Sequence, residues 1–184
     1  PEAAQFDRGR ALVTGSLAAW RRLAPDYFAL ERRFRGGDLA QIARMLEEYR
    51  LEDADYALVT IGSMTGAAKD AVDAARDRGE AVGIIKIKTF RPFPVEAINR
   101  ALSKVKAIGV VDRSVNFGWN CGPLYQETLA AAQQLQRFIP SASFIGGLAG
   151  SDITVEHFTQ VIEDTKQLLQ GRTYNEPIWI NRND

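Results

Sequence analysis

The chain has 184 residues, of which 46% are hydrophobic and 25% are charged, and its 23 basic and 23 acidic side chains give a formal net charge of zero. This length supports one good-sized hydrophobic core rather than two. No excess charge is present to attract a polyanion or an anionic membrane surface, so the composition argues against a nucleic-acid or membrane partner. Near-zero net charge favours association, which fits a piece of a larger assembly.

One cysteine, Cys121, and one histidine, His157, restrict the chemistry that the chain can hold. A single cysteine cannot form an internal disulfide, a usual four-ligand zinc site or a four-thiolate iron–sulfur cluster. We expect Cys121 to be buried and inert; the alternative is a reactive thiol whose pKa is lowered by the helix start that follows it. We expect His157 to be a surface or capping residue.

The beginning of the chain predicts neither export nor membrane insertion. No apolar run approaches the ~20 residues that cross a bilayer, and the first residues lack the pattern of a signal peptide. We therefore expect a cytoplasmic protein. The chain also lacks an initiator methionine, which suggests the remainder of a longer polypeptide.

Residues 1–50 differ in pattern from the rest. Pro25 and Asp38 favour the starts of two helices, over 25–33 and 38–49. We interpret residues 1–50 as a lead-in arm.

Strands and helices alternate between residues 51 and 170. Short apolar runs predict buried parallel strands at 56–61, 82–88, 107–111 and, more weakly, 143–146. Helical periodicity predicts helices at 67–78, 94–105, 122–137 and 155–169, the last one capped by Thr154. We therefore expect a three-layer α/β/α domain with a mainly parallel sheet, whose strand-to-helix loops all lie at the carboxyl edge.

The tail, residues 171–184, contains the apolar triplet Ile178, Trp179 and Ile180. We expect it to dock on its own domain or on a neighbour.

The connection at 88–94, KTFRPFP, carries two prolines, two phenylalanines and an arginine. Pro92 and Pro94 favour a stiff extended exit from the strand, and stiffness lowers the entropy cost of docking. We expect Arg91 and Phe93 to serve an interface. The alternative is that the phenylalanines complete the domain's own core.

Several residues at the carboxyl edge are candidates for a site. The glycine-rich loop at 62–66 offers backbone and hydroxyl donors at a helix N-terminus, where an anion can bind. In the alternative, Ser63 or Thr65 caps the helix and Arg91 pairs with Asp112 or Asp152, without a ligand. Aromatic residues such as Trp119 concentrate in interfaces. The predicted anion-binding or interface residues are Gly62, Ser63, Thr65, Gly66, Arg91, Phe93, Asp112, Arg113, Asn116, Phe117 and Asp152.

Four segments, in their order and spacing, resemble the C-terminal part of the α subunit of pyruvate:ferredoxin oxidoreductase and related 2-oxoacid:ferredoxin oxidoreductases. They are VTIGS at 59–63 with Gly66, FRPFP at 90–94, VDR at 111–113 followed by Phe117-Gly118, and GGLAGSDIT at 146–154. Residues 51–55 and 13–16 fit the family too. The family more often has a second glycine and then arginine before the aspartate of the last segment. Here Ala149 and Ser151 stand around Gly150, a departure that bears on the substrate more than on the fold.

The resemblance implies a transketolase C-terminal-like domain, with a mixed sheet of about five strands. The fifth strand would come from 1–20 or 172–184, and a pyrimidine-type domain would precede the arm. It also implies thiamine-diphosphate-dependent oxidation of pyruvate to acetyl-CoA with reduction of ferredoxin, or the reverse synthesis. The implied complex uses thiamine diphosphate, Mg²⁺, 4Fe–4S clusters and coenzyme A. Its parts are pyrimidine-type and pyrophosphate-type domains with gamma and ferredoxin-like delta subunits.

The chain itself does not carry the motifs of that chemistry. No paired asparagines follow Gly37-Asp38, and one cysteine cannot hold a cluster. We therefore expect a structural and interface domain that is inactive alone, with no catalytic or metal-binding residue of its own. The alternatives are another 2-oxoacid substrate (2-oxoglutarate, a branched-chain 2-oxoacid or oxalate) and a free-standing anion- or nucleotide-binding module.

Overall fold

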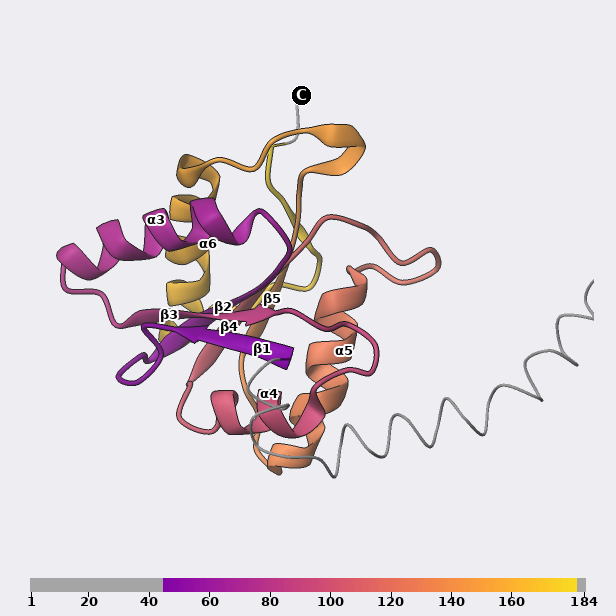
Figure 1. Cartoon of the computed structure of the whole chain (residues 1–184), viewed down its shortest axis with the longest axis horizontal. Coiled ribbons are helices and arrows are strands. Elements are labelled where there is room, and N and C mark those ends of the chain that lie inside the picture. Colours follow the sequence, from indigo (N-terminus) through magenta and orange to yellow (C-terminus); the bar gives the residue numbers. More distant parts are fainter. Residues whose placement is uncertain (1–44, 182–184) are drawn as a thin grey trace, which may run out of the picture. The chain divides into compact units, whose positions relative to one another are not determined.

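The fold is an alternation of strands and helices, seen in a computed structural model that describes residues 45–181 (Figure 1). The elements in chain order are β1 (Leu46–Tyr49), β2 (Tyr56–Ile61), α3 (Thr65–Asp77), β3 (Val82–Ile87), α4 (Val95–Leu102), β4 (Ala107–Asp112), α5 (Pro123–Ala132), η1 (Gln133–Leu135), β5 (Ser141–Ile145), η2 (Leu148–Gly150), α6 (Val155–Gln167), η3 (Leu168–Gln170) and β6 (Ile178–Trp179). None of the described helices is long and apolar enough to cross a membrane. The helix predicted at 25–33 and the first part of the one at 38–49 lie outside the described residues.

One sheet joins all six strands in the order β1-β3-β2-β4-β5-β6. The pairs from β3 to β6 are parallel, and β1 runs antiparallel to β3 at one edge. The predicted three-layer, mainly parallel and mixed architecture is confirmed, with six strands in residues 45–181 rather than about five.

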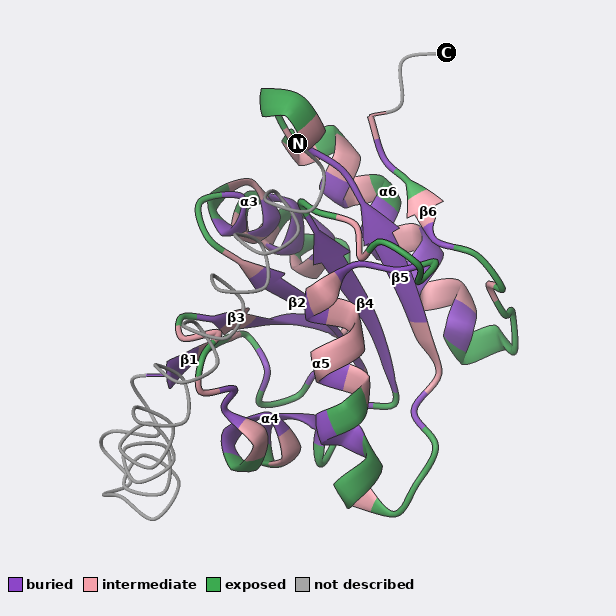
Figure 2. Cartoon of the chain, turned by 90° about the vertical axis from the view of Figure 1, so that its right-hand side faces the viewer, coloured by how far each residue is buried: buried purple, intermediate pink, exposed green. Residues whose placement is uncertain are grey.

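Helices cover both faces of the sheet, which is why the central strands β2 and β4 are almost entirely buried. Every residue of β4 is buried. One core lies between the sheet and helices α3 and α6, and the other lies between the sheet and α4 and α5 (Figures 1 and 2). Gly109 in β4 allows α6 to pack closely, because a Cβ there would come within 2.1 Å of Thr165 Oγ1.

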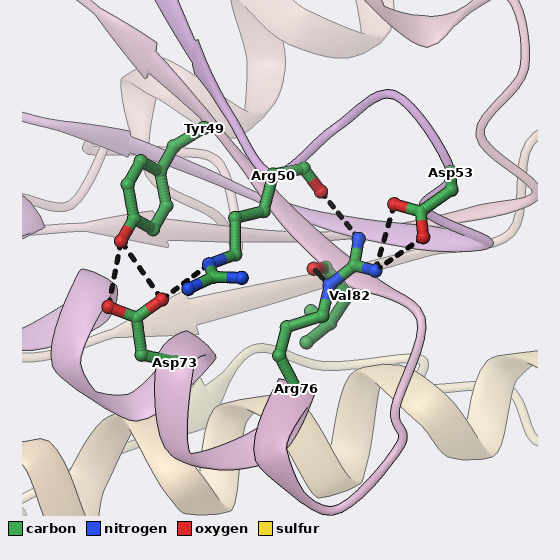
Figure 3. Close-up of polar contacts among 6 residues, drawn as sticks. All are labelled: Tyr49, Arg50, Asp53, Asp73, Arg76 and Val82. Atoms are coloured by element: carbon green, nitrogen blue, oxygen red, sulfur yellow. Dashed lines mark hydrogen bonds and ion pairs between the residues drawn. The ribbon is translucent and has the colours of Figure 1, made fainter.

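The antiparallel edge strand β1 corrects the prediction of a helix up to Tyr49, since residues 46–49 are extended. Leu46 pairs with Ile87 and Tyr49 pairs with Ile84. The Tyr49 hydroxyl also donates to both carboxylate oxygens of Asp73 on α3, at 2.9 and 2.7 Å (Figure 3). Tertiary pairing therefore determines the conformation of this segment.

Arg76 on α3 fixes the turn between β1 and β2 (Figure 3). Its guanidinium donates to the carbonyl oxygens of Val82 and Arg50, each at 2.6 Å, and pairs with Asp53 at 2.8 Å. One side chain thus connects a helix, the start of β3 and the β1–β2 turn.

The tail docks on its own domain. β6 pairs in parallel with β5, and Ile180 is buried. A strand therefore does come from 172–184, but the antiparallel edge comes from 46–49, which lies in neither of the ranges expected for the additional strand.

Two helix ends bear on earlier predictions. Thr154 caps α6 in a capping box, accepting from the N–H of His157, while His157 Nδ1 accepts from the N–H of Thr154. The capping roles predicted for both residues are confirmed.

Helix α5 stops at Ala132 and continues only as η1 to Leu135, so the helix predicted to extend to residue 137 was too long.

Candidate functional site

Four loops meet at the carboxyl edge of the sheet, because each follows a parallel strand. The order of the strands places residues 88–94 beside 62–64, then 113–122, then 146–154. This is the edge where open α/β sheets usually bind ligands and partners. Each loop is held by contacts of a different kind.

The loop at 62–64 turns sharply into α3. Gly62 has a φ of +76°, in the left-handed region. The Thr65 hydroxyl donates to the Gly62 carbonyl at 3.0 Å and lies 2.9 Å from Thr60 Oγ1, so it does not cap the helix. No side chain caps α3, so the alternative in which Ser63 or Thr65 caps the helix is wrong.

The first turn of α3 carries no acidic residue, and Gly62, Ser63 and Gly66 are exposed. These features are compatible with an anion. Anion binding at this loop remains a prediction.

The loop at 88–94 packs inward. Phe93 is 7% exposed within the core that α4 and α5 cover, and Phe90 meets it edge to face at 5.9 Å between ring centroids. Arg91 lies over the Phe90 ring at 4.3 Å and pairs with Glu127 of α5 at 2.5 Å. The alternative in which Arg91 pairs with Asp112 or Asp152 is therefore wrong in its partner, and the alternative that the phenylalanines complete the domain's own core accounts for both rings.

Asp112 ends β4 and caps α5 from a distance in sequence. Its carboxylate is 2% exposed and accepts the N–H groups of Leu124 at 2.8 Å and Tyr125 at 3.0 Å. Burial raises the pKa of Asp112 to about 6, against the opposite effect of the two N–H groups. The sequence placed Asp112 among the candidates, but nothing in the local pattern indicated this capping role.

Cys121 lies just before α5 and is buried. Burial, followed by the neighbouring charge of Asp112, raises the pKa of its thiol. A raised pKa lowers the thiolate fraction, which favours the expected inert thiol over the reactive alternative.

Arg113 connects two of the loops. Its Nε and Nη2 atoms donate to the Gly147 carbonyl at 3.3 and 3.2 Å, and Nη2 reaches the Ser151 carbonyl at 3.4 Å. Three residues of the loop at 146–154 have positive φ: Gly147, Ala149 and Gly150. Arg113 therefore holds a tightly folded loop in place.

Asn181 holds the same loop from the other side, and sequence reasoning missed it. Its side chain accepts from the N–H of Gly147 at 3.2 Å and donates to the carbonyl of Asp152 at 2.9 Å. Asp152 itself is exposed and contributes this backbone carbonyl. An isolated asparagine after a short apolar run gives no local signal of such a contact.

The loop at 113–122, which we name the aromatic loop, presents two rings to solvent. Phe117 is 101% exposed and Trp119 is 64% exposed. The loop is nevertheless ordered by its own contacts: Asn116 donates from its backbone to the Cys121 carbonyl at 3.0 Å and from its side chain to Gln126 at 2.7 Å. Among the predicted residues, Phe117 therefore has the exposure expected of an interface residue.

Comparison with known proteins places the chain in a family. Residues 54–158 match the family model described as pyruvate:ferredoxin oxidoreductase core domain II. The chain belongs to this family. The predicted resemblance to the 2-oxoacid:ferredoxin oxidoreductases is thereby confirmed.

The relatives of this core domain II protein include subunits of several enzymes. It is 62% identical over 143 residues to the NADH-dependent phenylglyoxylate dehydrogenase subunit alpha of Aromatoleum evansii, an alignment that covers 77% of this chain and 34% of the relative. It is 34% identical over 148 residues to the pyruvate synthase subunit PorA of Methanosarcina barkeri, covering 80% of this chain and 35% of the relative. The chain thus spans about a third of the length of these curated relatives.

Solved structures agree on the fold. A 2-oxoglutarate:ferredoxin oxidoreductase from Magnetococcus marinus superposes with a TM-score of 0.51 at 22% identity, covering 75% of this chain and 23% of that one. A split-gene transketolase superposes with a TM-score of 0.53 at 15% identity, covering 66% and 42%. The transketolase-like architecture is therefore shared.

Proposed function

We propose that this chain is the transketolase C-terminal-like domain of the alpha subunit of a cytoplasmic 2-oxoacid oxidoreductase complex. In this proposal it contributes structure and contact surface, and the reactive groups lie on other parts of the complex. The match of residues 54–158 to the family model is the observation that carries it. The division into an arm at 1–50, a domain at 51–170 and a docking tail at 171–184 belongs to the proposal.

The substrate that we propose is an aromatic 2-oxoacid of the phenylglyoxylate type. The support is the identity of 62% to a phenylglyoxylate dehydrogenase subunit, against 34% to a pyruvate synthase subunit over a similar length. Pyruvate is the second candidate because several relatives are pyruvate synthase subunits. The electrons would pass to ferredoxin or NAD⁺.

Mg²⁺ and iron–sulfur clusters, two of the groups that the family implies, lack a matching set of ligands among the described residues of this chain. In the part of the chain that the structure describes, no three His, Cys, Asp or Glu side chains come together in a way that could hold a metal ion. The sequence has a single cysteine, and it is buried. We therefore assign Mg²⁺ and the iron–sulfur clusters to the pyrimidine-type, pyrophosphate-type, gamma and delta parts of the complex, and in this proposal thiamine diphosphate and coenzyme A bind there too.

A free-standing anion-binding module is less well supported. Two nitrogens of Arg113 are engaged by carbonyls, and Arg91 is paired with Glu127. Among the described loops of the carboxyl edge, the turn at 62–66 keeps features of an anion site, through the exposed Gly62, Ser63 and Gly66. Stabilisation of the isolated chain by nucleotides or coenzyme A in a thermal-shift assay would favour this alternative.

The proposal is tested by tagging this chain in its native host and purifying what it binds. We expect a multi-subunit complex that oxidises phenylglyoxylate in the presence of coenzyme A, with kcat/KM above that for pyruvate by roughly 100-fold. The isolated chain should show no turnover. Preference for pyruvate would refute the substrate and leave the domain role, whereas absence of oxidoreductase subunits would refute the role itself.

A further inference from the structure

The last described residues, 172–181, form a strap that contacts helix α6 and ends beside strand β5. Near its start, the Tyr174 hydroxyl donates to a carboxylate oxygen of Asp164 on α6 at 3.1 Å, and Arg172 lies over the Tyr174 ring at 5.0 Å. Near its end, β6 pairs with β5 at one edge of the sheet (Figure 2). The strap is therefore anchored at two separate places.

Ile180 fixes the strap to the beginning of the loop at 146–154. Its backbone N–H donates to the carbonyl of Ile145 at 2.9 Å, and its side chain is buried. This side chain lies directly against Gly146, since a Cβ there would come within 2.4 Å of Ile180 Cγ1. Such a close approach needs a residue without a side chain. The strap and the loop therefore share one packed contact.

Asn181 follows at once and spans the same loop. Its side-chain oxygen accepts from the N–H of Gly147, and its side-chain nitrogen donates to the carbonyl of Asp152, at 3.2 and 2.9 Å. Its φ of +56° lies in the left-handed region, which asparagine adopts more readily than most residues do. One amide group thus ties the first part of the loop to its last part.

The loop depends on contacts from outside because its own conformation is unfavourable. Gly147, Ala149 and Gly150 all have positive φ, and the Cβ of Ala149, at +53°, disfavours this region. Arg113 supports the loop by donating to its carbonyls at 3.2–3.4 Å. A guanidinium can only donate, so the acceptor for the N–H of Gly147 comes from Asn181 of the strap.

The strap is weakly held compared with the centre of the sheet. Its strand β6 has two residues and lies at the edge of the described sheet. Within 172–181 the buried residues are Pro177 and Ile180, and Trp179 is 44% exposed. By contrast, every residue of β4 is buried. Segments with few buried contacts open at a lower free-energy cost than the core, so the strap should detach while the central strands stay folded.

We propose that the strap and the loop at 146–154 open and close as one unit, so that docking of the strap sets the conformation of this part of the carboxyl edge. In the open state the loop loses the contacts of Ile180 and Asn181, while β2 and β4 keep their structure. A partner that binds the closed loop also holds the strap in place, because such coupling is reciprocal. This conformational device goes beyond the proposed function and does not depend on the substrate, and its failure would leave the family role untouched.

The test is amide hydrogen exchange of the full 184-residue chain, followed residue by residue by NMR. The N–H of Gly147 reports on the loop and the N–H of Ile180 reports on the strap, because opening breaks the hydrogen bond that each donates. In the wild type the two amides should have similar protection factors, and both should be less protected than the amides of β4.

Two variants at opposite ends of the unit test the coupling. Tyr174→Phe removes the hydrogen bond between the strap and α6, a contact that does not involve the loop, and should speed exchange at Gly147 by roughly 5-fold. Arg113→Met removes the support of the loop that does not involve the strap, and should speed exchange at Ile180 by a similar factor. The amides of β4 should be unchanged in both variants.

The matched control is Asn175→Ala, which changes an exposed residue in the middle of the strap and should leave exchange at Gly147 and Ile180 unchanged. Thermal unfolding of each variant would verify that it is folded. The proposal is overturned if Tyr174→Phe leaves Gly147 unaffected or if Arg113→Met leaves Ile180 unaffected. It is also overturned if either variant speeds exchange in β4 to the same extent, because the opening would then be global.

Discussion

Asp112 and Gly122 lie in direct contact. A Cβ atom on Gly122 would come within 2.1 Å of Asp112 Cγ and 2.3 Å of its Oδ2. The buried carboxylate can reach the N–H groups of Leu124 and Tyr125 only because residue 122 has no side chain. This contact joins the end of β4 to the start of α5 and closes the aromatic loop between them.

Gly122→Ala should therefore destabilise the fold strongly. The new methyl group forces the carboxylate away from α5, and overpacking together with loss of a helix cap should lower the free energy of unfolding by about 2–4 kcal/mol. The free energy of unfolding of both chains is measured by urea unfolding, followed by circular dichroism.

The matched control is Gly66→Ala in the first turn of α3, where an added Cβ meets no atom within 4 Å. Alanine is the better helix former, so this variant should gain about 0.5–1 kcal/mol. Equal losses in both variants would show that the contact with Asp112 is not what makes Gly122 necessary.

Ionisation of Asp112 should weaken the fold as the pH rises. Its pKa is about 6 in the folded chain, above the ordinary 3.8, so between these values the folded state holds more protons than the unfolded state. Stability from this group is present below pH 4 and falls by roughly 3 kcal/mol as the pH passes 6. Comparison with Asp112→Asn isolates the effect, since other carboxylates titrate alike in both chains.

The difference in unfolding free energy between Asp112→Asn and the wild type should shift in favour of asparagine from pH 4 to pH 7. Any constant offset from the lost hydrogen bond is irrelevant, because only the change with pH is diagnostic. A flat difference, or one that shifts toward the wild type, would mean that the folded carboxyl has an ordinary or lowered pKa.

The guanidinium of Arg76 should contribute more to the stability of the fold than that of an ordinary surface arginine. Arg76→Met keeps the aliphatic stem and removes the donors to Val82, Arg50 and Asp53 (Figure 3). The bond to the Val82 carbonyl is part-buried, so leaving that acceptor unpaired should lower the free energy of unfolding by about 1–3 kcal/mol. Arg78→Met at the C-cap of α3 loses only exposed contacts and should change the free energy of unfolding by less than about 1 kcal/mol. Similar small losses in both variants would contradict the bracing role.

The sequence predicted the parts of the fold that depend on local pattern. The apolar runs of β2, β3 and β4 and the periodicity of α3 and α6 are local signals, and parallel strands joined by helices place the loops on one edge. The segment at 46–49, LEEY, gave no strand signal, because its residues continue the pattern of the helix predicted at 38–49. Its pairing with β3, nearly 40 positions further along the chain, makes it a strand.

The contacts of the candidate site were harder to predict for the same reason. Arg91 has several acidic residues within reach in principle, and only the fold brings Glu127 to it. Asn181 secures the loop at 146–154 because β6 carries it there. Exposure of Phe117 and Trp119 also follows from the conformation of the aromatic loop, which composition alone does not determine.

Substitutions of Phe93 and Arg91 distinguish the two explanations of the KTFRPFP connection, an interface and a part of the domain's own core. Phe93 is buried against the core, so Phe93→Ala should lower the free energy of unfolding by about 3–5 kcal/mol. Arg91 is 52% exposed and its pair with Glu127 is screened by solvent, so Arg91→Ala should change it by less than about 1 kcal/mol. Phe93→Leu restores most of the volume and should recover more than half of the loss. The measurement is urea unfolding of the full chain. A small loss of unfolding free energy in Phe93→Ala would favour the interface role that the sequence first suggested for this ring.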